Sequence, residues 1–408
     1  MGGTLATGMT AFAEDAVSPR LEKIDGFDEN VGLSTVGYWQ PFSDRKVRIG
    51  IAGNGVCSFG KVFIFQTHPN AEVVAVAEID PERRADLQAA TKAKRAYASC
   101  EEMIDRDGEL DAVFIATDAP SHAALAIRAL KRGLHVASCV PAIFGIDQLE
   151  LAEELFSLVK STGLVYALFE TSAFREQAIA IRELYRAGAL GEIDYAEGEY
   201  YHEIHAERPL GSYKGWRDGL PPMYYPTHAA AYYTCTTMKR LTEVSCFGTP
   251  STLAPFKDAA NAYKNPFGTE TALMRTETGG SLRVSVSWTL PFYRGELGRV
   301  WGTKGNFRTR FYGDKRLAKG VETRPFAFPK SFGNRNYHGG SHGYLTDDFL
   351  RAILLKRRPI VDVSLGLNTT LCGVIAHKSA LRGGELLKIP QFELASGDGA
   401  CGSRCVKL

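Results

Sequence analysis

The chain has 408 residues, of which 45% are hydrophobic and 23% are charged, and its formal net charge is +2. This length and composition are typical of a globular protein with a large core and two domains. Basic and acidic residues are mixed along the chain, so the charge pattern gives no reason to expect nucleic acid or a membrane surface as a partner. The eight cysteines lack zinc-ligand spacing and are expected to be mostly free thiols.

The two ends of the chain differ from the rest. Residues 1–13 are small and apolar and end in an Ala-x-Ala pattern, which resembles the back half of a secretory signal. The alternative is a disordered extension, so a periplasmic or exported location stays open beside a cytoplasmic one. Residues 14–45 are expected to form an arm over the domain surface. Residues 394–408 form a glycine- and serine-rich tail, in which a disulfide between Cys401 and Cys405 stays open.

A glycine-rich turn follows the first predicted strand. A β-branched run, Val47 to Ile51, breaks into Gly53-Asn54-Gly55 just before a segment that can be helical. Gly53 permits a tight turn, and Gly55 lets the backbone approach a pyrophosphate at a helix N-terminus. Ser58 stands where the usual fingerprint has its third glycine, and a small residue there should still allow the helix to pack closely on the strand. The pattern predicts a dinucleotide site, with a merely structural βαβ unit as the alternative.

The next predicted strand, 72–77, ends in Glu78-Ile79-Asp80. An acid at this strand end binds the ribose 2′-hydroxyl in dinucleotide sites. Glu78 would repel a 2′-phosphate, so NAD is the expected cofactor, while Arg83 and Arg84 keep NADP open. The remaining predicted cofactor contacts lie in the glycine-rich turn or after later strands: Val56, Cys57, Thr117, Ala119, Pro120, His122, Cys139 and Pro141.

Strands and helices alternate through residue 169. Helices are predicted at 81–90, 99–107, 123–131 and 147–161, and further strands at 111–116, 134–137 and 164–169. Alternation of this kind predicts a parallel, doubly wound sheet, and therefore a Rossmann domain over residues 46–169. Ligands of such sheets bind at the carboxyl ends of the strands, where the loop from Thr117 to His122 is expected.

The pattern changes at Glu170. Strand-like segments with turn signals between them follow at 193–202, 241–247, 270–276, 281–288, 298–302 and 305–311. Helices are predicted at 175–187, 344–356 and 365–381. A mostly antiparallel open sheet with one face covered by helices is expected, which makes residues 170–393 an α+β domain for substrate binding and oligomerisation.

With these motifs the chain resembles the superfamily of glucose-fructose oxidoreductase, inositol dehydrogenase and rhizopine catabolism proteins (Gfo/Idh/MocA). The likeness covers roughly residues 46 to 392. Its matching stretches are Gly53-Asn-Gly55, 77–83, 115–122, 133–136, Gly302-Thr-Lys-Gly305, 348–353 and 358–363. The resemblance implies NAD(P)-dependent oxidation of a hydroxyl on a sugar, cyclitol or glycoside. It also implies that the open sheet faces pair, giving a homodimer or homotetramer.

The chain departs from the redox members of this superfamily at two places. Most of them have Glu-Lys-Pro after the fifth strand, where the lysine assists proton transfer, but here the residues are Cys139-Val140-Pro141. Val140 cannot transfer a proton. Cys139 either lies near the nicotinamide or is a small buried filler. Redox members also carry an aspartate four residues before a histidine; here the histidine is His228, and Tyr224 stands in the place of the acid, beside the expected substrate.

The run Tyr225-Pro-Thr-His228 resembles the NAD-dependent α-N-acetylgalactosaminidases of the same superfamily, which hold NAD tightly and oxidise their substrate transiently. Those enzymes have Glu-Val-Pro where this chain has Cys139-Val-Pro, and a catalytic tyrosine close to the position of Phe174. An NAD-dependent glycosidase or lyase without net redox is therefore the alternative to an oxidoreductase. A cofactor-binding protein without turnover is a third interpretation.

Three residues are candidates for acid–base chemistry. His228 has a side chain suited to proton transfer from a sugar hydroxyl near neutral pH. Tyr225 is expected to relay a proton or orient the sugar, with simple packing as the alternative. Glu170 follows the sixth strand at the switch-point crevice, where an acid is either catalytic or a ligand anchor; otherwise it is an acid at a helix start.

Further residues are candidates for holding the substrate. Trp216 is suited to stacking on a pyranose face, and Arg217 to binding a carboxylate or hydroxyls. His338 and His342 border the sugar if the resemblance holds. His202 alternates with Glu203, His205 and Glu207 along a strand, but no third ligand pair has a secure spacing, so no metal site is predicted.

Overall fold

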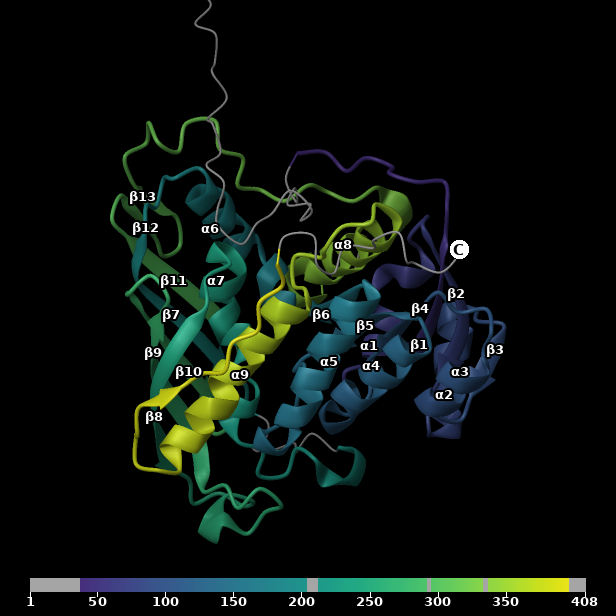
Figure 1. The fold of residues 1–408 in the computed structure, drawn as a ribbon, viewed down its shortest axis with the longest axis horizontal. Coiled ribbons are helices and arrows are strands. Elements are labelled where there is room, and N and C mark those ends of the chain that lie inside the picture. Colours follow the sequence, from purple (N-terminus) through teal and green to yellow (C-terminus); the bar gives the residue numbers. More distant parts are fainter. Residues whose placement is uncertain (1–36, 204–211, 292–294, 333–336, 396–408) are drawn as a thin grey trace, which may run out of the picture.

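The computed structural model describes residues 37–203, 212–291, 295–332 and 337–395. Two sheets lie on opposite sides of the molecule, and helix α9 (Val363–Ala380) runs between them (Figure 1). Several residues named above lie outside the described ranges: the signal-like segment 1–13, His205, Glu207, Cys401 and Cys405. None of the helices in these ranges is long and apolar enough to cross a membrane.

The first sheet is parallel, with strand order β3-β2-β1-β4-β5-β6. This is the order of a doubly wound dinucleotide-binding sheet, so the predicted Rossmann architecture is confirmed. Its strands are β1 (Val47–Ala52), β2 (Ala71–Ala77), β3 (Arg95–Tyr97), β4 (Ala112–Ile115), β5 (His135–Cys139) and β6 (Tyr166–Phe169). The edge strand β3 was not predicted, because its three half-buried or exposed residues form no apolar run.

The helices of the first domain are α1 (Phe59–Val62), α2 (Pro81–Thr91), α3 (Cys100–Arg106), α4 (His122–Lys131) and α5 (Leu149–Thr162). Helix α2 begins where expected, since Pro81 is its first residue and the Asp80 carboxylate accepts the Arg83 N–H. Helix α1, in the segment that the sequence allows to be helical, has only four residues. The chain leaves the helical conformation at Phe63, whose ring packs 4.9 Å from that of Phe114.

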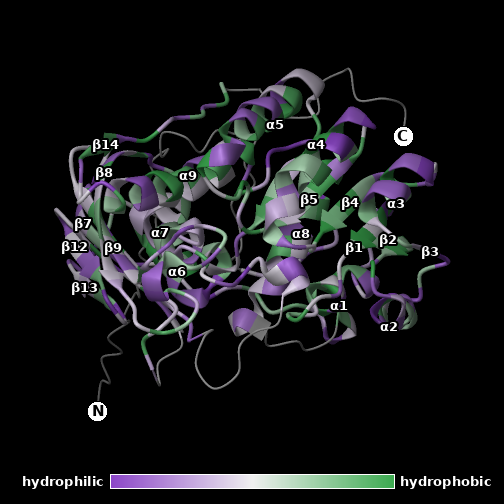
Figure 2. Cartoon of the chain, turned by 90° about the horizontal axis from the view of Figure 1, so that it is seen from below, coloured by the Kyte–Doolittle hydropathy of each residue, from purple (hydrophilic) through white to green (hydrophobic). Residues whose placement is uncertain are grey.

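The interior of the first sheet is apolar. Every residue of β4 and β5 is buried, and Figure 2 shows these central strands coloured as hydrophobic. A parallel strand covered by helices on both faces needs apolar side chains at successive positions, which explains why continuous apolar runs mark these strands in the sequence.

The second sheet has the order β13-β12-β11-β7-β10-β9-β8-β14. It is mostly antiparallel, as predicted, except that β10 runs parallel to β7. Its strands are β7 (Ile193–Tyr201), β8 (Leu241–Pro250), β9 (Phe267–Thr276), β10 (Ser281–Ser287), β11 (Gly295–Gly302), β12 (Gly305–Phe307), β13 (Phe311–Gly313) and β14 (Leu387–Lys388). The prediction of one strand over 305–311 is wrong, because residues 308–310 turn and make β12 and β13 a tight hairpin.

Helices α6 (Glu176–Arg186), α7 (Thr227–Thr237) and α9 cover one face of the second sheet (Figure 1). Gly198 of β7 makes the close approach of α7 feasible, because a Cβ there would lie 2.0 Å from the Ala229 carbonyl oxygen. The opposite face is turned outward. This outer face carries charged side chains, because Glu197 and Glu199 form ion pairs across the strands with Arg283 and Arg299.

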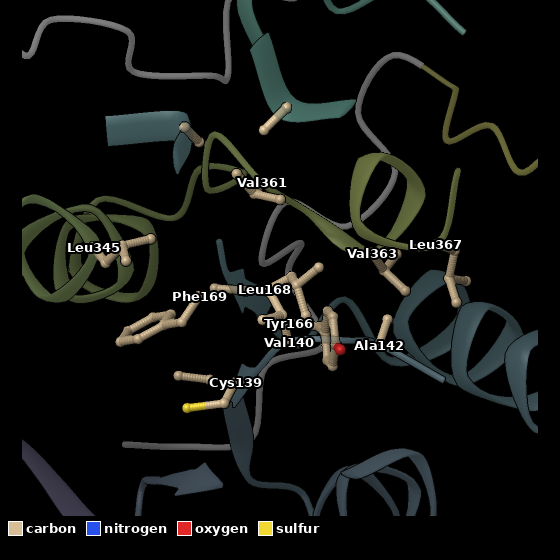
Figure 3. Packing of buried hydrophobic residues seen from close by; sticks show 14 of the residues in the cluster. Cys139, Val140, Ala142, Tyr166, Leu168, Phe169, Leu345, Val361, Val363 and Leu367 are labelled. Atoms are coloured by element: carbon tan, nitrogen blue, oxygen red, sulfur yellow. The ribbon is translucent and has the colours of Figure 1, made fainter. Parts of the chain in front are cut away.

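Two C-terminal helices, α8 (Ser341–Leu354) and α9, also pack on the first domain. The Leu168 N–H of β6 donates to the Val361 carbonyl (3.0 Å). In Figure 3, Val361 and Val363 lie on one side of Leu168 and Tyr166, with Leu367 beyond Val363. The boundary between the two sheets therefore falls between residues 169 and 170 of the chain. Helices α8 and α9 pack on both domains, so the two share one hydrophobic core.

The described part of the N-terminal arm lies over α8. The Trp39 indole donates to Asp347 Oδ1 (2.8 Å), and the Arg351 guanidinium stacks 4.1 Å from the Phe42 ring centre and donates to the Gln40 carbonyl. These contacts hold residues 39–42 against the helix.

Candidate active site

The glycine-rich turn is built around two close backbone contacts. Gly53 has a φ of +99°, and a Cβ at this position would lie 2.2 Å from the Ala116 carbonyl oxygen, so only glycine fits. A Cβ on Gly60 would lie 2.2 Å from the Gly53 carbonyl oxygen. Helix α1 therefore packs closely on β1 at Gly60 rather than at Ser58, which precedes the helix. Sequence reasoning missed Gly60, although a glycine inside a predicted helix often signals close packing.

A cavity of about 750 Å³ opens at the carboxyl ends of β1, β2, β4 and β5. Gly55 faces open space there, because no atom lies within 4 Å of the place that a Cβ on this residue would take. The volume lies in the range of small-molecule sites. Most of the predicted cofactor residues line this cavity: Gly53, Gly55, Val56, Cys57, Ser58, Glu78, Ile79, Asp80, Arg83, Thr117, His122 and Cys139.

Four predicted cofactor residues do not line the cavity: Asn54, Ala119, Pro120 and Pro141. The Asn54 side chain donates to Asp86 Oδ2 (2.8 Å) and so ties the glycine-rich turn to α2. The Pro141 carbonyl lies 3.1 Å from His122 Nδ1, and burial lowers the pKa of this histidine. These residues fix the loops that form the walls.

Glu78 ends β2 and is 8% exposed. Its carboxylate accepts the backbone N–H of Asn54 (2.6 Å) and of Asp80 (3.1 Å) while it lines the cavity. The carboxylate is thus held in one orientation by the turn that it faces. A glycine cradle with a fixed carboxylate acceptor at its edge fits a dinucleotide with a free ribose hydroxyl.

The second domain closes the other side of the cavity with Ser212, Tyr213, Lys214, Trp216, Arg217 and Tyr225. The Arg217 guanidinium stacks 4.5 Å from the Trp216 ring centre, and its Nη2 lies 3.9 Å from Cys57 Sγ in the glycine-rich turn. Trp216 in turn stacks on Tyr225 at 6.2 Å. The structure thus places Trp216 and Arg217, predicted to bind substrate, at the nucleotide cavity.

The Cys139-Val140-Pro141 turn carries no group for proton transfer. Val140 is 6% exposed and lies among apolar side chains that include Ala142 and Leu168 (Figure 3). Burial raises the pKa of the Cys139 thiol well above its ordinary value, so the thiol stays protonated. Any acid–base group must come from elsewhere.

A buried histidine–carboxylate pair lies at the junction of the two domains. His228, in the first turn of α7, places Nδ1 2.7 Å from Glu170 Oε1. Glu170 follows β6 and is fully buried, and the same oxygen accepts the Ser172 N–H (2.8 Å). The two side chains that the sequence singled out separately thus form one unit, with Nε2 as the imidazole atom left for exchange with a substrate.

A second carboxylate, Glu296 of β11, belongs to the same cluster. The Ser172 hydroxyl donates to Glu296 Oε2 and lies 3.5 Å from His228 Nδ1. Arg175 binds both oxygens of Glu296, through Nη2 (2.8 Å) and Nε (3.1 Å). Sequence reasoning missed Glu296, because no motif surrounds it in its strand.

The charges of this cluster oppose the effect of burial. Burial by itself lowers the pKa of His228, but the charges of Glu170 and Glu296 outweigh it, and the pKa is raised above its ordinary value. Burial likewise raises the pKa of Glu296, but the charges of His228 and Arg175 outweigh that effect, and the pKa is lowered. The site therefore favours a carboxylate beside an imidazolium.

A series of aromatic contacts links the pair to the nucleotide cavity, which neither His228 nor Glu170 lines. The Tyr200 ring meets the His228 imidazole edge-on at 4.6 Å. Trp288 contacts Tyr200 (5.6 Å) and also Tyr225 (6.2 Å), whose side chain lines the cavity. Tyr225 thus lies between the cavity and the pair, and burial raises its pKa.

His338 and His342 lie on the α8 side of the cluster. His338 Nδ1 is 2.9 Å from His342 Nε2, and the His342 ring stacks on Phe63 at 4.1 Å. Burial lowers the pKa of His338 to about 4, with a contribution from the charge of His228, and that of His342 to about 3. Both imidazoles are therefore neutral near neutral pH.

The remaining predicted substrate residues lie apart from the cavity. Tyr224 packs edge-on against Phe144 (5.5 Å) and His377 (5.2 Å), which makes it part of the contact between the domains. His202 continues β7 through a backbone hydrogen bond to Ser287 (2.9 Å). Within the described ranges no three His, Cys, Asp or Glu side chains come together as a metal site.

Comparison with known proteins agrees with this geometry. Residues 47–169 match the family described as "Oxidoreductase family, NAD-binding Rossmann fold". A curated relative, a glycosyl hydrolase family 109 protein of Saccharopolyspora erythraea, is 23% identical over 288 residues, which cover 64% of this chain. The match spans 62% of that relative, less than two thirds of its length.

Two solved structures have the same fold. The scyllo-inositol dehydrogenase of Lactobacillus casei superposes with a TM-score of 0.65 at 17% identity, covering 85% of this chain and 99% of that one. A levoglucosan dehydrogenase solved with NADH superposes with a TM-score of 0.67 at 17% identity, covering 85% of this chain and 100% of that one. The likeness extends over both sheets.

Proposed function

We propose that this chain, which belongs to the Gfo/Idh/MocA superfamily through its NAD-binding Rossmann domain, is an enzyme that oxidises a hydroxyl of a sugar, cyclitol or glycoside with NAD. The observation that carries the proposal is the buried Glu170–His228 pair (2.7 Å) beside a cavity built by the glycine-rich turn. A cofactor cavity and a separate acid–base pair are the two parts that oxidation of a carbinol requires.

The residues of the first domain hold the cofactor. Gly53 and Gly55 would allow the backbone to approach the pyrophosphate, and Glu78 would accept a hydrogen bond from the adenosine ribose. When bound, NAD supplies the hydride acceptor. Because Glu78 places a negative charge at this end of the cavity, NAD is favoured over NADP.

The pair at the domain junction handles the proton. His228 takes the proton of the substrate hydroxyl on Nε2, because Nδ1 is held by Glu170. Glu170 fixes the tautomer and the orientation of the imidazole and stabilises the imidazolium that forms. Tyr225, between this pair and the cavity, is placed to orient the substrate hydroxyl.

A second candidate function is a glycosidase or lyase that holds NAD and shows no net redox. The curated relative named above, a glycosyl hydrolase family 109 protein, supports it. So does the closure of the cavity by Trp216 and Arg217, because a cofactor that is regenerated in each turnover has no need to leave. In this mechanism His228 returns the proton that it took.

The two functions differ in what appears in solution. The purified protein is incubated with NAD and a panel of sugars, cyclitols and glycosides, and free NADH and released reducing sugar are both measured. Free NADH formed in step with substrate loss supports the oxidoreductase, whereas reducing sugar without free NADH supports the glycosidase. Neither product from any compound, with NAD bound, would contradict both and leave a cofactor-binding protein without turnover.

A further inference from the structure

Two carboxylates face one histidine at the domain junction, and only Glu170 touches the imidazole directly. We propose that Glu296 is a positioning residue that, through Ser172, acts with Glu170 to stabilise the imidazolium form of His228. The inference rests on the proposed function only for what His228 does in the reaction, since its effect on the imidazole is measurable without a substrate.

The contacts of Glu296 hold its charge beside the histidine. Its side chain is 6% exposed, and Arg175 fixes both carboxylate oxygens. The Ser172 hydroxyl, which donates to Glu296, is 3.5 Å from His228 Nδ1. A single serine side chain therefore lies between the second carboxylate and the imidazole.

The charge of Glu296 decides which protonation state of His228 makes the buried cluster neutral. Glu170 and Glu296 contribute two negative charges and Arg175 one positive charge, so the buried cluster is neutral only when His228 is an imidazolium. Without Glu296, the charges of Glu170 and Arg175 cancel and the cluster is neutral with a neutral imidazole. Unbalanced charge is costly at low dielectric, so Glu296 shifts the preferred state from imidazole to imidazolium.

Three further titratable side chains near the cluster carry no charge near neutral pH. They are Tyr200 of β7, which contacts the imidazole, Tyr232 of α7, close to Glu296 and Arg175, and His338 before α8. Burial raises the pKa of both tyrosines and lowers the pKa of His338 to about 4. Within the described part of the chain, the charge balance at His228 thus depends on Glu170, Glu296 and Arg175.

The consequence for the reaction is a stronger base. As the carbinol is oxidised, its O–H bond breaks and the proton forms an N–H bond at Nε2. The hydride would leave the carbon with its electron pair, NAD being the acceptor that the proposed function supplies, and the C–O bond would become a carbonyl. Glu296 stabilises the imidazolium that results. The same stabilisation keeps His228 protonated at low pH, so the rate of oxidation is expected to rise with pH through the pKa of His228.

The test follows the titration of His228 by NMR in protein labelled with ¹³C-histidine, with the signal assigned from His228→Gln. Glu296→Gln is expected to lower the pKa of His228 by about one pH unit or more, because a nearby opposite charge is lost. Arg175→Met is expected to raise it, because a repelling charge is lost. If the two substitutions merely disordered the site, they would not be expected to shift the pKa of His228 in opposite directions.

Two further variants complete the experiment. Ser172→Ala keeps both charges but removes the hydroxyl, and is expected to lower the pKa of His228 by less than Glu296→Gln does. Glu199→Gln, in the ion pairs on the outer face of the same sheet, is the matched control and should leave the titration unchanged. If Glu296→Gln fails to fold, the pKa of His228 in Arg175→Met and in Ser172→Ala tests the proposal, which is contradicted if neither variant shifts it.

An unchanged titration of His228 in Glu296→Gln would overturn the proposal. Where a substrate has been found, the acid limb of kcat/KM should move to lower pH in the same variant, whereas a merely structural role for Glu296 would lower the rate without moving the limb. If the titration shifts but no compound is turned over, the inference about Glu296 stands and the proposed function fails.

Discussion

The nucleotide cavity and the His228 cluster are assembled in different ways. The cavity wall in the first domain comes from turns that directly follow β1, β2, β4 and β5, so each contribution is a short local motif. The cluster combines residues from the end of β6, the start of α7 and β11, with Glu296 124 positions from Ser172. The shape of the cavity depends on the residues of each turn, whereas the arrangement of the cluster depends on how the two domains pack.

Because the two regions are built from different residues, we expect NAD binding and the chemical step to respond to different substitutions. The cavity forms at the edge of the first sheet, where changes should alter NAD affinity. The cluster contacts Tyr200 and does not line the cavity, so changes in it should alter turnover but leave NAD in place. Three substitutions or pairs of substitutions test whether the two regions are independent, and a fourth tests association through the second sheet.

The largest effect is expected from His228→Ala. Loss of a single general acid–base group lowers the rate by on the order of 10² to 10⁴. NAD binding, measured by calorimetry, should be unchanged, because the imidazole does not line the cavity.

A matched control exists in the same domain. His377 and Glu270 form another buried pair, with Nδ1 2.8 Å from Oε1. His377→Ala should cost stability, as His228→Ala does, by about 1 to 3 kcal/mol. Only the His228 variant should lose turnover on the best substrate of the panel. Rates near wild type in His228→Ala would remove the histidine from the mechanism and leave Glu170 as the candidate base.

Two glycines sharpen the description of the cavity. Gly53→Ala should destabilise the protein by about 2 to 3 kcal/mol, because its Cβ would overlap the Ala116 carbonyl and its φ is +99°. Gly55→Ala should change stability by less than about 0.5 kcal/mol, because its Cβ points into open space. It should nevertheless weaken NAD about tenfold or more, or about 1.4 kcal/mol. Equal thermal stability of the two variants would contradict this account of the turn.

Glu78→Ala should weaken NAD by about 1 to 3 kcal/mol, the range for a hydrogen bond to a charged group. Glu82→Ala, in the first turn of α2 and outside the cavity lining, is the control and should bind NAD as the wild type does. Calorimetric titration with NAD measures both. If Glu78→Ala retains the wild-type affinity, the carboxylate serves only to hold the Asn54 and Asp80 backbone.

The smallest effect concerns association, which we propose to involve the outer face of the second sheet. Leu273, 56% exposed on β9 beside the ion pairs, should contribute to the contact. Leu273→Asp should weaken a dimer or tetramer by about 1 kcal/mol, whereas Leu355→Asp at the end of α8 should not. Light scattering at micromolar concentration measures the oligomeric state of each protein. A wild-type protein that is only monomeric would contradict the proposed interface.

The fold was largely predictable because its signals are local. Alternating apolar runs and helices predict the doubly wound sheet, and the capping of α2 by Asp80 is visible as Asp-Pro in the sequence. Features that depend on tertiary packing were missed. The short strand β3 has no apolar pattern of its own, and the end of α1, whose bounds the sequence did not predict, comes where Phe63 enters the core.

The site was only partly predictable for the same reason. His228 and Glu170 were named from motifs, but their pairing across 58 positions was not, and Glu296 carries no local signal at all. Trp216 and Arg217 were predicted to bind substrate and lie on the cavity wall beside the glycine-rich turn, a neighbourhood that the sequence did not predict, because the face toward which a loop turns depends on how the domains pack.

We propose that His228 acts as the base when NAD in the neighbouring cavity oxidises the substrate. The most direct test mixes protein loaded with NAD with the best compound of the panel in a single turnover and follows the absorbance of reduced nicotinamide. Wild-type protein should show it, whether lasting or transient, and His228→Ala with NAD bound should not. Substrate turnover by the wild type without any reduced nicotinamide, or equal reduction in His228→Ala, would contradict the account.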